Sequence, residues 1–350
     1  GSGDDQIYIR EGVLVPVELN GESGTDVLFH EGSGFGTLNG GSEWDYLVIG
    51  DLADGEMNGG GGNDYMFTSS TSGIVMNGGA GDDQMFGGAG DDIINGDGGR
   101  DEIYGMGGLD QIDGGTEDDL IRLDLSQAAL TTVEGGAGID VIEITATSGG
   151  DDLVVGNILG LNKLLVRYAE ASDGSIESIE FETLMLLTLG GNDTVTVEPL
   201  YESNLQKVQI DAGKGGRDTV VVKGTDGGDT FTLTDYTLTD VGEGVQVATN
   251  LSNRVSVYNV QVVNSVRAQG DTLEIRSLGG IDTIDASAIT FDRIAIEIYA
   301  GDGGDILKGS PFDDILDSGR GGDTVTGGLG FDQFFDNSQQ GDTDTLIETF

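Results

Sequence analysis

The chain has 350 residues, including 63 Gly, 63 Asp or Glu, 15 Lys or Arg, one His and no Cys, and its net charge is -48. The absence of Cys excludes a disulfide scaffold, and the excess of carboxylates excludes a nucleic-acid or anionic-membrane binder, which needs a basic face. No apolar run approaches the roughly 18 residues that a membrane helix needs, and hydrophobic residues make up 37% of the chain at fixed spacing, which excludes simple disorder.

This acidic excess repels itself in the compact state unless cations neutralise it. Hard divalent cations such as calcium take carboxylate and carbonyl oxygens. Zinc is disfavoured, because a zinc site is built from His and Cys and the chain has one His and no Cys. The composition therefore predicts a folded protein that binds divalent metal.

Over the range from 20 to about 80 the sequence repeats with a constant period. In one loop of each period, a Gly-rich stretch ends in an Asp that precedes a short apolar run; these evenly spaced residues are Asp26, Asp45, Asp64 and Asp83. In the other loop the equivalent position is occupied by Gly36, Gly55 and Ile74. We therefore expect coils with metal on mainly one edge over this range.

From Gly78 five nine-residue units follow without a break: GGAGDDQMF, GGAGDDIIN, GDGGRDEIY, GMGGLDQID and GGTEDDLIR. Their sixth positions are Asp83, Asp92, Asp101, Asp110 and Asp119. Six Gly-rich residues can adopt left-handed backbone conformations and bring carbonyl oxygens together. The next three alternate polar, apolar, polar, which predicts a very short strand with one inward side chain. Two units make one coil, so alternate Asp residues are predicted to form columns.

The middle of the chain, about 144–299, has longer strand-like runs and a second repeat of about 80–90 residues, in which LGGNDTV at 189 recurs as LGGIDTI at 278. This spacing favours wider coils of a parallel β-helix. Asp140 and Asp218 are candidate metal ligands here, and Asp193, Asp229 and Asp282 are weaker candidates with few partner loops at a distance of two repeat units. The best helical candidate, 161–171, is expected to be strand and loop.

Near the end the nine-residue units return as AGDGGDILK, GSPFDDILD, SGRGGDTVT and GGLGFDQFF. Their sixth positions are Asp305, Asp314, Asp323 and Asp332. No linker marks a boundary, and we predict one solenoid in three parts: an N-terminal roll at 1–125, wider coils at 126–299, and a C-terminal roll with a trailing segment at 300–350.

These units resemble the RTX, or haemolysin-type, calcium-binding nonapeptide family, whose unit is G-G-x-G-x-D-x-U-x with U a large apolar residue. The resemblance implies an all-β fold, a right-handed parallel β-roll or β-helix solenoid, with calcium between successive loops held by the sixth-position Asp and by loop carbonyls. Glu43 and Glu117 stand where the family pattern has its second-loop Gly. This departure puts in doubt the two cages, meaning the calcium sites of oxygen ligands between stacked loops, at these positions. The predicted calcium ligands are Asp26, Asp45, Asp64, Asp83, Asp92, Asp101, Asp110, Asp119, Asp140, Asp218, Asp305, Asp314, Asp323 and Asp332.

Stacked pairs of these Asp residues predict about eight calcium ions, with one ion in each gap. Because metal binding to a site absent from the unfolded chain contributes folding free energy, the calcium-free chain is expected to be substantially unfolded. The resemblance also implies type I secretion from bacteria and folding outside the cell, so the expected location is secreted or at the cell surface. A start without Met indicates a fragment or a processed product.

The expected function is a structural, adhesive or surface-layer segment that is not an enzyme. The alternative is a calcium-binding carrier module of a secreted polysaccharide-active or hydrolytic enzyme, or an enzyme in the wider coils, which a long cleft with basic and aromatic residues would favour. His30 is expected to be a solvated loop side chain rather than a catalytic base. Besides calcium, the expected partners are further copies of the chain or a cell-surface polysaccharide.

Overall fold

The protein is described by a computed structural model that covers residues 1–51, 53–128, 130–158, 163–169, 175–200, 204–213, 215–238, 242–251, 259–263, 270–336 and 343–347. Over these ranges the regular structure is all strand, and no helix is present that could cross a membrane. The chain forms two compact units, Gly1–Thr145 with Ala171–Leu184, and Ala146–Glu170 with Met185–Phe350. The three-part division at residues 125 and 299 stays a prediction.

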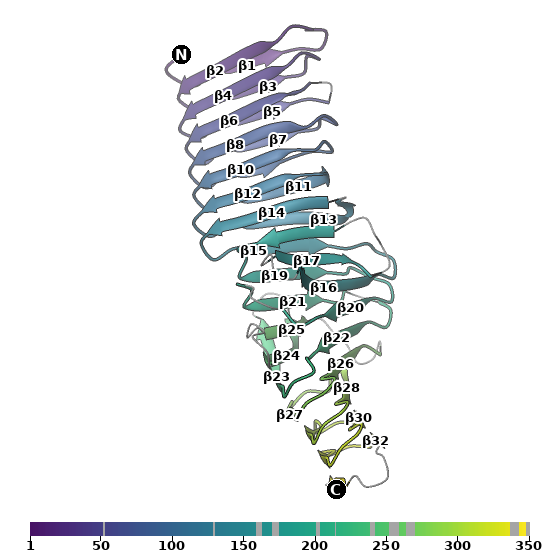
Figure 1. The fold of residues 1–350 in the computed structure, drawn as a ribbon. Helices are drawn as coiled ribbons and strands as arrows, with labels where there is room; N and C mark the ends of the chain where they lie inside the picture. The colour runs from purple at the N-terminus through teal and green to yellow at the C-terminus, as the bar shows by residue number, and fades with distance from the viewer. Residues whose placement is uncertain are drawn as a thin grey trace. The chain divides into compact units, whose positions relative to one another are not determined.

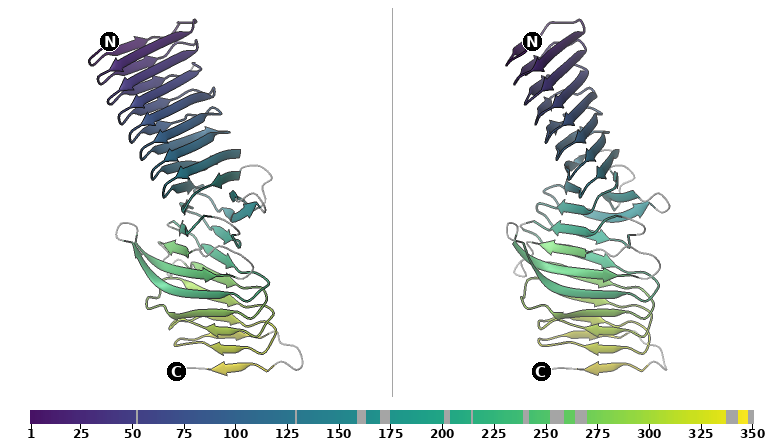
Figure 2. Two further views of the ribbon diagram at one scale, coloured as in Figure 1. Left: turned by 60° about the vertical axis from the view of Figure 1, so that its left-hand side comes forward. Right: turned by 90° about the vertical axis from the view of Figure 1, so that its left-hand side faces the viewer.

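The first unit is a stack of coils with two main strands per coil, and each strand pairs in parallel with its equivalent in the next coil (Figure 1). One sheet contains β1 (Gln6–Ile9), β3 (Val27–His30), β5 (Tyr46–Ile49), β7 (Tyr65–Thr68), β9 (Gln84–Phe86), β11 (Glu102–Gly108), β13 (Leu120–Ala128) and β15 (Val141–Thr145). The other contains β2 (Val17–Ser23), β4 (Gly36–Ser42), β6 (Gly55–Gly61), β8 (Ile74–Ala80), β10 (Ile93–Gly98), β12 (Gln111–Thr116), β14 (Leu130–Ala137) and β18 (Ser175–Ile179). Figure 2 shows the same stacking from two further sides.

The core of the first unit is formed by inward side chains that stack from coil to coil. Leu28 aligns with Leu47 of the next coil, and further along the chain Ile94 aligns with Ile112. One inward row of one sheet consists of Leu28, Leu47, Met66, Met85, Ile103 and Ile121, all fully buried. Burial of each such side chain contributes about 1.5–3 kcal/mol. The periods predicted from the sequence are therefore the coil lengths of the fold.

Two side-chain ladders reinforce this register. An amide ladder joins Asn20, Asn39, Asn58, Asn77 and Asn95, in which each side-chain NH₂ donates to the carbonyl oxygen of the Asn one coil earlier at 2.7–2.9 Å. An aromatic ladder follows the outer face of the other sheet through Tyr8, Phe29, Tyr46, Tyr65, Phe86 and Tyr104, with ring centroids 4.5–6.4 Å apart. A slip of one residue would break both ladders.

The second unit also consists mainly of parallel strands, paired between successive coils. One sheet contains β16 (Asp152–Ile158), β20 (Thr194–Val197), β22 (Thr219–Lys223), β26 (Thr272–Arg276), β28 (Ala295–Tyr299), β30 (Ile315–Asp317) and β32 (Gln333–Phe335). The facing strands are β21 (Lys207–Asp211), β23 (Thr230–Leu238), β25 (Asn259–Val263), β27 (Thr283–Ala288), β29 (Ile306–Lys308), β31 (Thr324–Thr326) and β33 (Thr345–Ile347). Strand β19 (Thr183–Leu187) crosses the unit boundary, which follows Leu184.

Two antiparallel additions interrupt the second unit. β17 (Lys163–Tyr168) pairs with β16, and β24 (Gly242–Asn250) pairs with β23 and β25. The second addition is the long green hairpin of Figure 2. These hairpins were not predicted. The expectation of strand rather than helix is confirmed for 163–168, whereas 161, 162, 170 and 171 lie outside the described residues.

The all-β parallel solenoid predicted from the repeats is confirmed. The expectation of a solvated His30 is wrong. His30 ends β3 at an inward position, is 0% exposed, and its Nε2 lies 2.8 Å from the carbonyl oxygen of Gly34. Strand alternation turns this side chain into the core, in register with Ile49.

Candidate metal centres

The sixth-position Asp side chains are buried in the loops that end each coil edge. Each predicted ligand is 0–3% exposed, apart from Asp332, which is half-buried. A carboxylate is rarely this buried unless it is paired or coordinates a metal. The partners of the two carboxylate oxygens therefore decide what the loops can bind.

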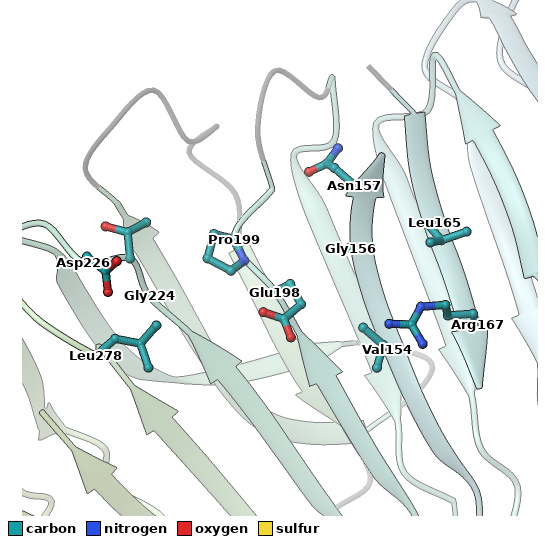
Figure 3. A pocket seen from close by; sticks show the side chains of 11 residues that line it. Val154, Gly156, Asn157, Leu165, Arg167, Glu198, Pro199, Gly224, Asp226 and Leu278 are labelled. Carbon is teal, nitrogen blue, oxygen red and sulfur yellow. The ribbon is translucent and has the colours of Figure 1, made fainter. Parts of the chain in front are cut away.

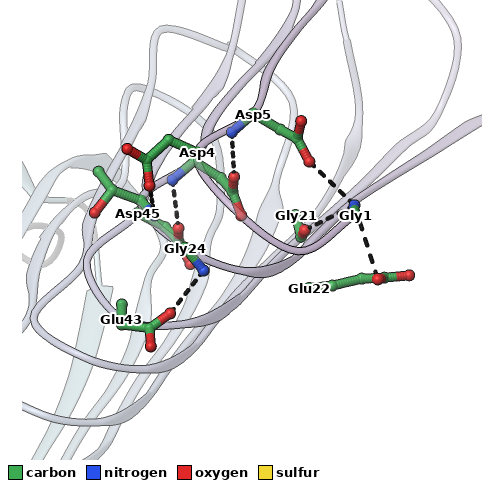
Figure 4. A network of polar contacts seen from close by, with 10 residues as sticks. Gly1, Asp4, Asp5, Gly21, Glu22, Gly24, Glu43 and Asp45 are labelled. Atoms are coloured by element: carbon green, nitrogen blue, oxygen red, sulfur yellow. Dashed lines mark hydrogen bonds and ion pairs between the residues drawn. The ribbon is translucent and has the colours of Figure 1, made fainter.

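In most of these loops one oxygen of the Asp, Oδ1, accepts the backbone N–H of the equivalent residue one coil earlier. In the first unit these bonds form an unbroken column with N···O distances of 2.6–2.9 Å. The column runs through Asp5, Asp26, Asp45, Asp64, Asp83, Asp101, Asp119 and Asp140. It ends where Asp140 N–H donates to the Glu182 carboxylate at 2.9 Å. Figure 4 shows its first loops, in which Gly24 N–H also donates to Glu43 at 2.6 Å.

The other oxygen, Oδ2, is buried without a hydrogen-bond partner in most of these loops. This group comprises Asp26, Asp45, Asp64, Asp83, Asp92, Asp101, Asp119, Asp140, Asp193, Asp218, Asp282, Asp305 and Asp323. Among the predicted ligands, Asp110, Asp314 and Asp332 are outside the group. An unpaired buried carboxylate oxygen is costly, so its recurrence at one loop position indicates a missing partner.

The space beside Oδ2 is kept open by the Gly at the first loop position. A Cβ added to Gly40 would lie 2.4 Å from Asp45 Oδ2 and 2.7 Å from the Gly59 carbonyl oxygen of the next coil. At Gly78 the equivalent distances, to Asp83 Oδ2 and to the Gly96 carbonyl oxygen, are 2.4 and 2.8 Å. Two hard oxygens thus converge where no side chain fits, which is the donor set that calcium prefers.

Burial also changes the acidity of seven of these carboxylates. Desolvation raises their pKa values, in all but Asp64 with a contribution from neighbouring carboxylates, although the backbone N–H bonds oppose the shift. The values are about 6 for Asp64, about 7 for Asp45, Asp83, Asp110 and Asp119, and about 8 for Asp92 and Asp101. The loops therefore favour either a proton or a cation on each carboxylate.

On the opposite edge of the first unit, the carboxylates begin later in the chain. Gly36, Gly55 and Ile74 align in register, as predicted, and supply no ligand side chain. Ile74 N–H donates to Asp92 Oδ1 at 2.7 Å, and Asp92 N–H donates to Asp110 Oδ1 at 3.0 Å. A second, shorter column therefore begins at Asp92.

The second unit contains further columns that link loops far apart in sequence. One joins Asp151, Asp193, Asp218 and Asp271, another joins Asp229, Asp282, Asp305, Asp323 and Asp344, and a third joins Asp314 and Asp332. Consecutive Asp residues of one column are up to 53 residues apart in sequence, because hairpins and longer loops are inserted between successive coils.

Sequence reasoning missed several members of these columns. Asp151, Asp271 and Asp344 were not predicted, because their partners do not lie two repeat units away. The signal that could have identified them is an Asp followed by any residue and then a buried Leu or its equivalent, as in Asp151 with Leu153 and Asp271 with Leu273. Glu182 shows the same pattern with Glu in place of Asp, because buried Leu184 lies two residues further on.

The two Glu residues at Gly positions keep the loop conformation. Glu43 and Glu117 have φ of 72° and 80°, within the left-handed region that Gly occupies at the same position in neighbouring loops. Such a conformation costs a residue with a Cβ about 1–2 kcal/mol. The fold therefore retains the backbone of both cages.

The donor set fits calcium rather than a transition metal. Within the described ranges, no three Asp, Glu, His or Cys side chains converge as a metal cluster. The converging oxygens are instead one carboxylate and backbone carbonyls, which suit a hard cation.

The second unit also has two surface hollows. One, of about 430 Å³, is lined by Val154, Asn157, Leu165, Arg167, Glu198 and Asp226 among others (Figure 3). The other, of about 730 Å³, includes Arg276, Tyr299 and Arg320. Arg276 lies over the Tyr299 ring, 5.5 Å from its centroid, and forms an ion pair with Glu274. The basic groups therefore lie among carboxylates, an arrangement that does not favour a polyanion.

Comparison with protein families identifies the RTX calcium-binding nonapeptide repeat in four copies, at residues 56–73, 75–103, 86–121 and 299–334. Comparison with individual curated proteins gives no match. The first three copies lie in the first unit, where the long Asp column runs, and the fourth lies in the second unit.

Proposed function

Since the chain carries RTX calcium-binding nonapeptide repeats, we propose that it is a calcium-folded segment of an extracellular bacterial protein with a structural, adhesive or surface-layer role. The observation that carries the proposal is the recurrence of buried, unpartnered Asp Oδ2 atoms beside Gly-lined gaps. The proposed ligands are the carboxylates predicted from the repeats, with Asp193 and Asp282 added by their unpartnered Oδ2 atoms.

In this proposal each carboxylate holds an ion together with the carbonyl of the next loop. Calcium supplies the positive charge that these buried oxygens otherwise lack. The N–H bond from each Asp to the next Oδ1 orients the neighbouring carboxylate, so that ordering of one loop positions the next. Because these gaps exist only in the folded coil, calcium binding contributes folding free energy.

The extracellular location is proposed from the calcium requirement. Sites of roughly 10⁻⁴ to 10⁻³ M affinity are filled at extracellular calcium concentrations and empty in the cytosol. The net charge of -48 and the Gly-rich loops would keep the calcium-free chain unfolded and competent for type I secretion. The role would be non-catalytic, and the partners would be further copies of the chain or a cell-surface polysaccharide.

The second candidate is a carrier module of a secreted polysaccharide-active or hydrolytic enzyme. The hollow that contains Arg276, Tyr299 and Arg320 supports it, because guanidinium and aromatic groups bind sugars. Measurable binding of an oligosaccharide that is lost in Tyr299→Ala would favour this candidate over the structural role.

The test of calcium-coupled folding is a calcium titration of chelator-treated protein, followed by circular dichroism and light scattering, with magnesium as the control. We expect β-sheet signal to appear cooperatively at sub-millimolar to millimolar calcium, but not with magnesium, which keeps its water ligands. Rising scattering would indicate assembly. A chain that is folded in chelator and indifferent to calcium would refute the proposal.

A further inference from the structure

Three loops of the second unit close in a different way from the rest. Each has a hydroxyl residue four positions before its Asp: Thr147 before Asp151, Thr225 before Asp229 and Ser310 before Asp314. The backbone N–H of the hydroxyl residue donates to Oδ2 at 3.0, 2.6 and 2.6 Å, respectively. The hydroxyl donates to Oδ1 of the same carboxylate at 2.9, 3.1 and 2.9 Å.

These donors occupy both carboxylate oxygens. Oδ2 is the atom that is unpartnered in the other loops, and Oδ1 is the atom that elsewhere accepts the N–H of the preceding coil. All three carboxylates are 1–7% exposed, so water does not replace these donors. Donors that bond to a buried carboxylate stabilise its charge without an ion.

The backbone conformation of these loops explains how the hydroxyl residue comes to bond to the carboxylate. At the second loop position, Gly41 and Gly79 have φ of 123° and 107°. Thr147, Thr225 and Ser310 occupy this position but are outside the left-handed region, which Thr in particular resists. In this conformation their backbone N–H points toward the carboxylate and donates to Oδ2.

Two of the loops retain the Gly at the first loop position and the carbonyl oxygen of the next coil that border the gap. A Cβ added to Gly224 would lie 2.5 Å from Asp229 Oδ2 and 2.9 Å from the Ser277 carbonyl oxygen. At Gly309 the distances to Asp314 Oδ2 and to the Gly327 carbonyl oxygen are 2.7 and 2.2 Å. The hydroxyl residue thus supplies donors to the carboxylate in loops that keep the Gly-lined gap of the first unit.

The three loops also share a place in the fold. Asp151, Asp229 and Asp314 are each the first Asp in a column traced by the described hydrogen bonds of the second unit. From each of them, the backbone N–H donates to the next Asp of its column at 2.7–3.1 Å.

We propose that Thr147, Thr225 and Ser310 replace a calcium ion in their loops, so that each Asp column of the second unit starts from a metal-independent loop. The inference rests on the proposed calcium binding of the other loops. It reassigns Asp314, which its spacing marks as a calcium ligand, to a hydroxyl-closed loop. It also implies that part of the second unit stays ordered at calcium concentrations that leave the other loops empty.

The test is a count of bound calcium in single variants of the full chain. Thr225→Gly and Ser310→Gly remove the hydroxyl and let the loop adopt the left-handed conformation of the ion-binding loops. Equilibrium dialysis with metal analysis should find one more calcium ion in each variant than in the wild type. Thr225→Ser retains the hydroxyl and should leave the count unchanged, with circular dichroism in calcium confirming the fold of all four proteins.

Three outcomes would overturn the inference. A folded Gly variant with the wild-type ion count would mean that the hydroxyl does not exclude an ion, and an additional ion in Thr225→Ser would mean the same. Failure of both Gly variants to fold in millimolar calcium would show that an ion cannot replace the hydroxyl. A wild-type chain that binds no calcium would refute the proposed function itself, whereas a calcium-folded wild type with unresponsive variants would refute the present inference alone.

Discussion

The stacking of the loops depends on Gly residues that have a left-handed backbone and lie close to the preceding coil, and Gly60 provides the clearest case. Gly60 has φ of 107°, and a Cβ at this residue would lie 2.3 Å from the Gly41 carbonyl oxygen of the preceding coil. The adjacent Gly61 is outside the left-handed region, and its Cβ would meet nothing within 4 Å. The pair therefore offers a test and a matched control.

Gly60→Ala should destabilise the folded coil. The left-handed conformation alone costs Ala about 1–2 kcal/mol, and relief of the contact with a backbone carbonyl must shift one loop against the next. Gly61→Ala should be neutral or stabilising by about 0.4–1 kcal/mol, because Ala restricts the unfolded chain. Gly60→Ala should therefore be less stable than Gly61→Ala by at least about 1 kcal/mol.

The assay is denaturant unfolding of both variants in saturating calcium, followed by circular dichroism. A lower transition midpoint for Gly60→Ala and an unchanged or higher midpoint for Gly61→Ala are expected. Equal midpoints would refute the argument, because they would mean that the loop backbone relaxes at no cost and that close stacking does not require Gly at this position.

Three further predictions concern the carboxylates and the amide ladder. Asp83→Asn should lose one bound calcium ion in equilibrium dialysis, while Asp113→Asn, which removes an exposed carboxylate from a strand, should keep the wild-type count; equal losses would contradict the site assignment. In chelator, the β-sheet signal should increase as the pH falls from 8 to 5. The pKa values of the folded Asp residues, about 6–8, exceed the ordinary value of about 3.9, so the folded state binds more protons than the unfolded state and its stability falls as the pH rises through this range. A β-sheet signal that does not change with pH would argue against carboxylate repulsion. Asn58→Ala should lower stability by about 1–3 kcal/mol by removing bonds to Asn39 and Asn77, and a changed calcium count in this variant would contradict a purely structural ladder.

The columns in the first unit could be predicted from particular residues. Asp83, Asp101 and Asp119 recur at a constant spacing of two repeat units, and the structure joins them directly. The prediction succeeded because strand alternation leaves one register in which the apolar residue of each unit points inward. The loops between these strands are short and uniform, so sequence spacing translates into spatial stacking.

The second unit shows where this reasoning fails. Asp218 and Asp271 are 53 residues apart, yet Asp218 N–H donates to Asp271 at 3.2 Å. Sequence spacing cannot identify such a pair, because the residues between them include the β23–β24 hairpin. The hydroxyl of Thr225 was likewise unrecognised, since its role depends on the carboxylate toward which its loop folds.

The sequence by itself determined the coil, the inward residues and most buried carboxylates, because each follows from a local repeat that fixes loop conformation and strand alternation. The tertiary structure decided which distant loops stack, that His30 is buried, and which carboxylate oxygens lack a partner. These features depend on the atoms that the next coil supplies, and where insertions vary the distance to that coil, no local pattern specifies them.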